Sequence, residues 1–254
     1  MFLDKKKIVS FLKKSNIKKG DTVFFHGNSM AIFQVEGSNP KSKTKNFWDC
    51  IFDFIGKNGT IIVPSFTYSI NKDEVFNIKM SKSKVGQFSE DFRQFYLTER
   101  TSDPIFSVCT YGREKRNIKK LSFKNSFGKN SIFDYLYSKN VKIICLGCEL
   151  KVVTFLHYVE QVLNVPYRKF KMFNAKILNK KNKIINTKIK FFCRRSGINY
   201  DYNLLHLKKE MIKKNKLIIL KFGRIKSYSF KAKDFFMECK KILKKNNEIL
   251  INEI

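Results

Sequence analysis

The chain has 254 residues, and its 52 Lys and Arg against 21 Asp and Glu give a formal net charge of +31. Hydrophobic residues make up 43% and aromatic residues 15% of the chain, which is too apolar for a disordered polycation, so we expect a folded protein with a large core. The longest apolar run, around residues 141–146, is far shorter than the roughly 18 residues that span a bilayer. Residues 1–14 lack the apolar segment of a secretory signal, so we expect a cytoplasmic protein without membrane insertion.

The positive charge has two interpretations. A basic surface attracts nucleic acids, but 44 of the basic residues are Lys and only 8 are Arg, whereas contacts to bases favour Arg. Lys, Asn, Ile and Phe are abundant together, as AT-rich codons dictate, so we interpret most of the charge as solvated surface and expect no nucleic-acid partner. Residues 169–254 nevertheless carry +18 against +13 on residues 1–168, which leaves the C-terminal part a candidate for binding a polyphosphate.

Six cysteines are scattered along the chain. Cys145 and Cys148 form a C-x-x-C pair inside an apolar run, without the second pair or the nearby histidines that a zinc site needs. We therefore expect core packing for both, with no disulfide framework and no metal.

The first part of the chain alternates helical and extended segments, which is typical of a βαβ organisation. The predicted elements are, in order, a helix at 8–12, a strand at 22–26, a polar loop at 27–44, a helix at 47–55, a strand at 60–63, a helix at 85–95, a strand at 105–111, a helix near 132–137, a strand at 141–147 and a helix at 154–163.

The pattern changes after residue 168. The segments 170–178 and 183–193 alternate partly around a polar turn and predict an antiparallel β-hairpin, and a helix at 202–214, strands at 217–222 and 227–230 and a helix at 232–245 follow. We expect one domain over residues 1–254, with a layered α/β core in 1–168 and a β-rich and helical C-terminal part in 169–254.

The clearest candidate for chemistry is His157, one of only three histidines. On a helix, His157 and Glu160 share one face, and a carboxylate one turn from an imidazole can raise its basicity, as a general base requires. Thr154 would open this helix as its N-cap, close to the carboxyl end of the preceding strand. The same spacing also fits a surface ion pair, so both interpretations stay open at this point.

A second candidate site follows the first predicted strand. His26 ends that strand and precedes the small residues Gly27, Asn28 and Ser29, whose backbone N–H groups could hold a phosphate. Arg100 could clamp a phosphate or form a structural pair with Glu99 or Asp103. We interpret the third histidine, His206, as structural.

Several segments together resemble the aminoglycoside 3-N-acetyltransferase family. They occur in the family's order over residues 8–170: G-D-T-V-F-F-H-G-N-S-M at 20–30, G-T-I-I-V-P-S-F-T at 59–67, V-G-Q-F-S-E-D-F-R at 85–93, R-T-S-D-P-I-F-S-V at 100–108, S-F-G at 126–128, T-x-x-H-x-x-E at 154–160 and V-P-Y-R at 165–168.

The resemblance implies an αβα mixed sheet and direct acetyl transfer from acetyl-CoA to an amine in a ternary complex. His157 matches the family's histidine and would be the general base, with Glu160 orienting it, and Thr67 would donate to the oxyanion. Acetyl-CoA, with no metal, would bind through these cofactor residues: His26, Gly27, Asn28, Ser29, Met30, Arg100, Ser107 and Val108.

The expected acceptor follows from two differences from the drug-modifying members. Asp103 and Phe106 replace two histidines of those members, and a charge of +31 is unfavourable for a polycationic aminoglycoside. The chain is therefore more similar to relatives that acylate amino sugars for surface polysaccharides, and we expect a nucleotide-linked amino sugar as the acceptor. An aminoglycoside-modifying enzyme, a basic nucleic-acid-binding protein and an inactive partner subunit are the alternatives, and a homodimer is compatible with the sequence.

Overall fold

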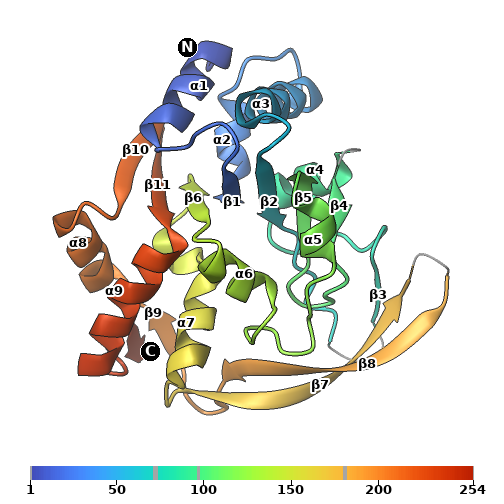
Figure 1. Ribbon diagram of the computed structural model, residues 1–254, viewed down its shortest axis with the longest axis vertical. Helices are drawn as coiled ribbons and strands as arrows, with labels where there is room; N and C mark the ends of the chain where they lie inside the picture. The colour runs from blue at the N-terminus through green and yellow to red at the C-terminus, as the bar shows by residue number, and fades with distance from the viewer. Residues whose placement is uncertain (1, 71–73, 96–97, 180–181, 254) are drawn as a thin grey trace.

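A seven-stranded mixed sheet runs through the centre of the computed structural model, which describes residues 2–70, 74–95, 98–179 and 182–253. Its strand order is β10-β11-β6-β1-β2-β5-β4, and helices lie against both faces (Figure 1). The strands are β1 (Thr22–Gly27), β2 (Thr60–Pro64), β4 (Glu99–Arg100), β5 (Val108–Gly112), β6 (Lys142–Leu146), β10 (Ile218–Phe222) and β11 (Ile225–Lys231). β6, β1 and β2 are parallel, and the strands outside them pair antiparallel. The expected layered α/β fold with a mixed sheet is confirmed.

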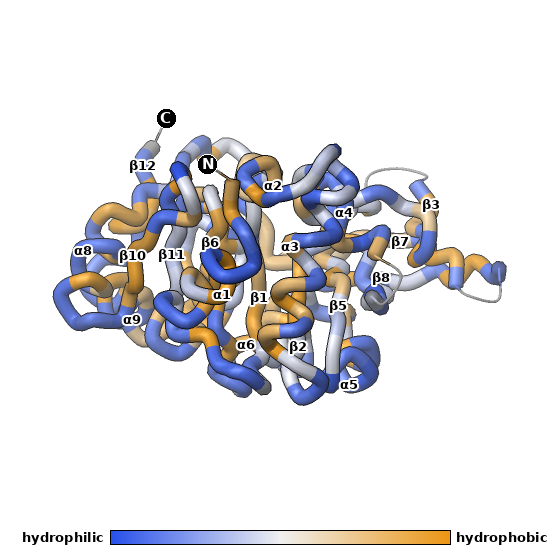
Figure 2. The backbone as a smooth tube through the Cα atoms, turned by 90° about the horizontal axis from the view of Figure 1, so that it is seen from above, coloured by the Kyte–Doolittle hydropathy of each residue, from blue (hydrophilic) through white to orange (hydrophobic). Residues whose placement is uncertain are grey.

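The helices form a separate core on each face of the sheet, because successive side chains of a strand point to opposite faces. Phe24 belongs to one core with α6, α7 and α9, whereas Val23 and Phe25 pack with α1, α3 and α4 in the other. The helices are α1 (Lys5–Lys14), α2 (Ser29–Phe33), α3 (Pro40–Ile55), α4 (Gln87–Gln94), α5 (Lys115–Lys119), α6 (Ile132–Ser138), the 3₁₀ turn η1 (Leu150–Val152), α7 (Phe155–Leu163), α8 (Leu205–Lys213) and α9 (Ala232–Lys245). Figure 2 shows hydrophobic residues around β1 in the middle and hydrophilic residues on the outer loops.

The predicted hairpin is present as β7 (Arg168–Leu178) and β8 (Ile184–Arg194), which pair antiparallel and extend along one side of the molecule (Figure 1). Beside β7 lies the short parallel strand β3 (Val75–Asn77). A further two-stranded sheet joins β9 (Tyr200–Tyr202) to β12 (Ile251–Glu253). The sequence division at residue 168 does not divide the main sheet, since β10 and β11 extend it beyond β6.

Two local expectations are corrected. The polar loop at 27–44 contains α2 and the start of α3, because Asn28 caps the first helix and Asn39 the second, followed by Pro40. The strand expected at 105–111 begins at Val108 instead. The Asp103 carboxylate accepts hydrogen bonds from the backbone N–H groups of Ile105 and Phe106, which fixes a turn before the strand.

Candidate active site

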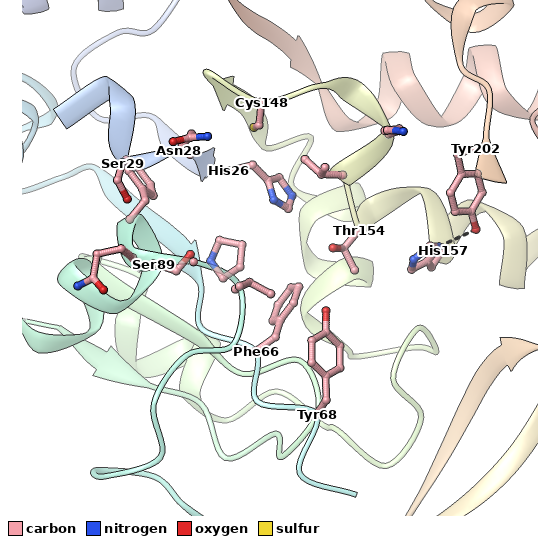
Figure 3. Close-up of a pocket in the computed structure, with 18 of the residues that line it drawn as sticks. His26, Asn28, Ser29, Phe66, Tyr68, Ser89, Cys148, Thr154, His157 and Tyr202 are labelled. Carbon is pink, nitrogen blue, oxygen red and sulfur yellow. Dashed lines mark hydrogen bonds between the residues drawn. The ribbon is translucent and has the colours of Figure 1, made fainter. Parts of the chain in front are cut away.

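A cleft of about 770 Å³ opens where the carboxyl ends of β1, β2 and β6 meet (Figure 3). One part of it is lined by residues 26–29, at the end of β1 and just after it, and by residues 85–89, just before α4 and in its first turn. Thr154 and His157 line the opposite part, together with Tyr202 of β9. These segments are distant in sequence, and the parallel strands bring them to one edge of the sheet, where open α/β sheets bind ligands.

His157 and Glu160 form the hydrogen-bonded pair that the helical spacing predicts. His157 Nδ1 lies 2.8 Å from Glu160 Oε2, one turn along α7. The Glu160 side chain is fully buried, whereas that of His157 is 22% exposed and lines the cleft. The pair is therefore not a surface ion pair, which was the alternative interpretation of this spacing.

Other side chains surround the Glu160 carboxylate completely. Tyr167 and Tyr202 donate their hydroxyl hydrogens to Oε1 at 2.9 and 2.8 Å. Arg168 Nε lies 2.8 Å from Oε2. A buried carboxylate needs such partners, because an unpaired buried charge is costly.

These contacts assign the tautomer of His157. An ionised carboxylate only accepts hydrogen bonds, so the short contact to Glu160 places the imidazole hydrogen on Nδ1. Arg168 Nη2 lies 3.0 Å from the same nitrogen, but both are donors in this state, and Nη2 donates to the Tyr202 hydroxyl at 2.6 Å instead. Nε2 of His157 is consequently the unprotonated nitrogen, as a base requires.

The surroundings keep His157 neutral and Glu160 charged. Burial lowers the pKa of His157 below its usual 6.5, and the positive charge of Arg168 lowers it further against the opposing effect of Glu160. Burial alone would raise the pKa of the Glu160 carboxyl, but the hydrogen bond from His157, the positive charge of Arg168 and the hydrogen bond from Tyr202 hold it below its usual value.

At the other part of the cleft, His26 is buried among the ends of β1 and β6. Its Nε2 has no hydrogen-bond partner in the described part of the chain, and burial lowers its pKa to about 4. The ring is therefore neutral at pH 7, and it points toward the middle of the cleft (Figure 3). An unpaired buried polar nitrogen at this position fits a site that a polar ligand completes.

The loop after His26 is shaped by packing. A Cβ on Gly27 would lie 2.5 Å from the Phe88 ring, so glycine allows α4 to approach this loop. The Asn28 side chain accepts a hydrogen bond from the Met30 N–H at 2.9 Å and starts α2. Gly27, Asn28 and Ser29 line the cleft as expected, whereas Met30 is 58% exposed and is not part of the lining.

The structure does not bring Thr67 to the cleft. Its side chain is 1% exposed, and its hydroxyl donates to the Pro104 carbonyl at 2.8 Å. A hydroxyl held in this way is unavailable to an oxyanion, which corrects the expectation from the sequence.

Arg100, Ser107 and Val108 are also buried away from the cleft. The Arg100 guanidinium donates to the Ser65 and Ser107 hydroxyl groups, both at 3.1 Å, and to the carbonyl groups of Ser65 and Ser81. It therefore connects loops around β2 and β5, and neither proposed carboxylate partner is needed. These three residues are structural here, not ligands of a cofactor.

Two smaller expectations also change, and a third residue, His206, lies outside the cleft. Thr154 makes no capping hydrogen bond, and its side chain lines the cleft. Cys145 is buried in β6 as expected, but Cys148 is only half-buried and lines the cleft. His206 is exposed on α8.

Arg168 and Tyr202 are the site residues that the sequence did not single out. Arg168 begins β7 and Tyr202 ends β9, so no helical or strand spacing relates either of them to His157. The V-P-Y-R segment at 165–168 was the one available signal, since it contains both Tyr167 and Arg168.

A family model described as aminoglycoside 3-N-acetyltransferase matches residues 24–244. The chain belongs to this family. It is therefore a coenzyme A-dependent N-acetyltransferase with acetyl-CoA as its co-substrate, as the resemblance implied. No curated protein matches the sequence significantly.

Several solved structures share this fold. The aminoglycoside acetyltransferase AAC(3)-Xa is 17% identical, with a TM-score of 0.80 over 96% of this chain and 93% of that one. The YokD protein from Bacillus subtilis is 20% identical, with a TM-score of 0.80 over 98% and 96%. AAC-IIIb, solved as a binary complex with CoASH, is 16% identical, with a TM-score of 0.79 over 96% and 97%.

Membrane-spanning helices and metal-binding groups are both absent from the described residues. Across residues 2–70, 74–95, 98–179 and 182–253, no helix is long and apolar enough to cross a membrane. Within the same ranges, no three His, Cys, Asp or Glu side chains are grouped so that they could hold a metal ion.

Proposed function

We propose that this enzyme transfers the acetyl group of acetyl-CoA directly to the amine of a nucleotide-linked amino sugar. The observation that carries the proposal is the His157–Glu160 pair, which presents an unprotonated imidazole nitrogen to the cleft. An amine is nucleophilic only without its extra proton, and a neutral imidazole is suited to remove it near pH 7.

His157 and Glu160 have distinct parts in this reaction. His157 Nε2 accepts a proton from the amine while the amine nitrogen attacks the thioester carbonyl carbon. The C–N bond forms, the C–S bond breaks, and the imidazolium returns the proton to the leaving sulfur, which gives free coenzyme A. Glu160 fixes the ring through Nδ1 and stabilises the imidazolium, because its carboxylate is buried and charged.

The cofactor is expected at the His26 part of the cleft. Gly27, Asn28 and Ser29 leave small side chains and backbone next to the cavity, and the buried Nε2 of His26 lacks a partner there. Thioester and acceptor would then meet between His26 and His157, which face the cleft from opposite sides (Figure 3).

The charges of the cleft favour this acceptor over an aminoglycoside. Lys151 and Arg194 line the cleft with Asp201 as the acidic residue of the lining, and Asp201 is already paired with Lys151 at 2.9 Å. A polycation would meet no free carboxylate among these lining residues, whereas an anionic nucleotide sugar meets complementary charge.

Calorimetric titration with acetyl-CoA, at about 0.15 M salt to screen surface charge, tests the first part of the proposal. We expect saturable 1:1 binding that ATP does not reproduce. Release of the coenzyme A thiol is then measured with a nucleotide-linked amino sugar, with the free amino sugar and with the aminoglycoside sisomicin. Equal binding of ATP and acetyl-CoA, or faster acetylation of sisomicin than of the nucleotide sugar, would contradict the proposal.

A further inference from the structure

The rim of the cleft beside Tyr202 carries a fixed positive group that the proposed chemistry does not use. Arg194, the last residue of β8, lines the cleft there. Its Nη1 donates to the Tyr200 carbonyl at 2.8 Å, and its guanidinium carbon lies 4.2 Å from the centre of the Tyr200 ring. Stacking and a hydrogen bond to the backbone restrict this side chain, so it is preorganised for binding.

Arg194 and His157 lie beside the same aromatic ring. The Arg194 guanidinium carbon is 5.7 Å from the centre of the Tyr202 ring, and the His157 ring is also 5.7 Å from it. A phenol ring and a pyranose ring are similar in size. One sugar ring could therefore place its amine at His157 while a substituent on another ring atom reaches Arg194.

Among the described residues that line the cleft, the negative charge near this rim is that of Asp201, which interacts with Lys151 and Arg194. Lys151 lies on η1 and pairs with Asp201, both about half exposed. Arg168 is buried next to His157, and its charge is paired with that of Glu160. A guanidinium with free N–H groups recognises phosphate oxygens well, because it donates two parallel hydrogen bonds.

We propose that Arg194, with Lys151 beside it, forms an anion subsite that binds a phosphate group on the acceptor, about one sugar ring from the amine that is acetylated. The inference rests on the proposed function and makes it more specific. Arg194 would select phosphate-bearing amino sugars, so the free sugar and a polycationic amine are expected to be poor acceptors. Arg194 positions the acceptor and takes no part in proton transfer.

The test uses the full chain saturated with coenzyme A, so that the cofactor's own phosphates do not compete. Inorganic pyrophosphate is titrated by calorimetry into the wild type, Arg194→Gln and Lys188→Gln. Lys188 is an exposed residue of the same strand and controls for the loss of one charge. We expect Arg194→Gln to weaken pyrophosphate binding about 10–100-fold and Lys188→Gln to leave it unchanged. Equal weakening in both variants, or no binding to the wild type, would overturn the subsite.

Kinetics separate this inference from the proposed function. With a nucleotide-linked amino sugar, Arg194→Gln should raise KM while kcat changes little, and Arg194→Lys, which keeps the charge, should recover part of the affinity. With the unphosphorylated amino sugar, the wild type and Arg194→Gln should be equal. If the wild type acetylates both sugars with the same KM, the subsite is wrong although the acetyltransferase proposal stands. If no amine is acetylated, the proposed function itself fails.

Discussion

Two helices beside the cleft, α7 and α4, each carry a buried glutamate three residues from a basic side chain, but the two pairs do different things. Glu160 pairs with His157 on α7, and Glu90 pairs with Arg93 on α4. In the first pair, the partner's second nitrogen remains available to the cleft. In the second, Nη1 of Arg93 donates a hydrogen bond to the Lys79 carbonyl.

The surroundings of Glu90 are those of a structural tie. Glu90 accepts hydrogen bonds from the Ser83 N–H, from Gln94 and twice from Arg93. Burial would raise the pKa of Glu90, but these bonds outweigh it and lower the pKa to about 2. The pair therefore joins the segment before α4 to the helix. In both helices, i, i+3 spacing predicts a buried pair. The further contacts of the basic side chain determine whether one of its nitrogens remains available to the cleft.

His157→Ala should have the largest effect. Loss of the general base should lower kcat/KM about 10²–10⁴-fold, measured as release of the coenzyme A thiol. The fold should persist, because Glu160 keeps Arg168 and both tyrosines as partners. His206→Ala is the matched control, since His206 is exposed outside the cleft. Turnover near that of the wild type in His157→Ala would exclude His157 as the base.

Glu90→Gln should have the opposite profile. It leaves Arg93, 12% exposed, without its carboxylate, and we expect a loss of about 3 kcal/mol in the free energy of unfolding measured with urea. The kcat/KM of the folded enzyme should change little.

Glu74→Gln provides the control for that experiment. Glu74 pairs with Lys84 on the surface, and both are about half exposed, so the loss should stay within about 1 kcal/mol. The structural role of the Glu90–Arg93 pair would be wrong if Glu90→Gln were as stable as the wild type, or if it folded but were inactive.

The pH dependence of kcat/KM should show the smallest effects. The pKa of His157 is lowered, so its base form persists below pH 6.5 and activity is lost only as the pH falls through that lower value. Glu160→Gln should move this acidic limb to lower pH, because Glu160 raises the pKa of His157. Arg168→Gln should move it to higher pH, because Arg168 lowers that pKa. Movement in the same direction would refute the assigned network.

The order of elements and the His157–Glu160 pair could be predicted from the sequence because they depend on local periodicity. Each strand of the hairpin, each element of the βαβ unit and α7 has a periodicity of its own that can be recognised in its own segment of the sequence. The short helix α2 was missed because Asn28 caps it inside a polar segment, and hydrophobic periodicity is weak over five residues. The roles of Thr67 and Arg100 were wrong because sequence position near a strand end does not specify where a side chain finds its hydrogen-bond partners.

The α/β class, the family and the histidine that faces the cleft can all be predicted from the sequence. The groups that surround this histidine are known only from the folded structure. Arg168 and Tyr202 reach Glu160 from β7 and β9, and Arg194 comes to the rim at the end of the long hairpin. The physical reason is that a helix fixes neighbours three and four residues apart, whereas contacts between elements depend on how the strands bring distant segments to one edge of the sheet.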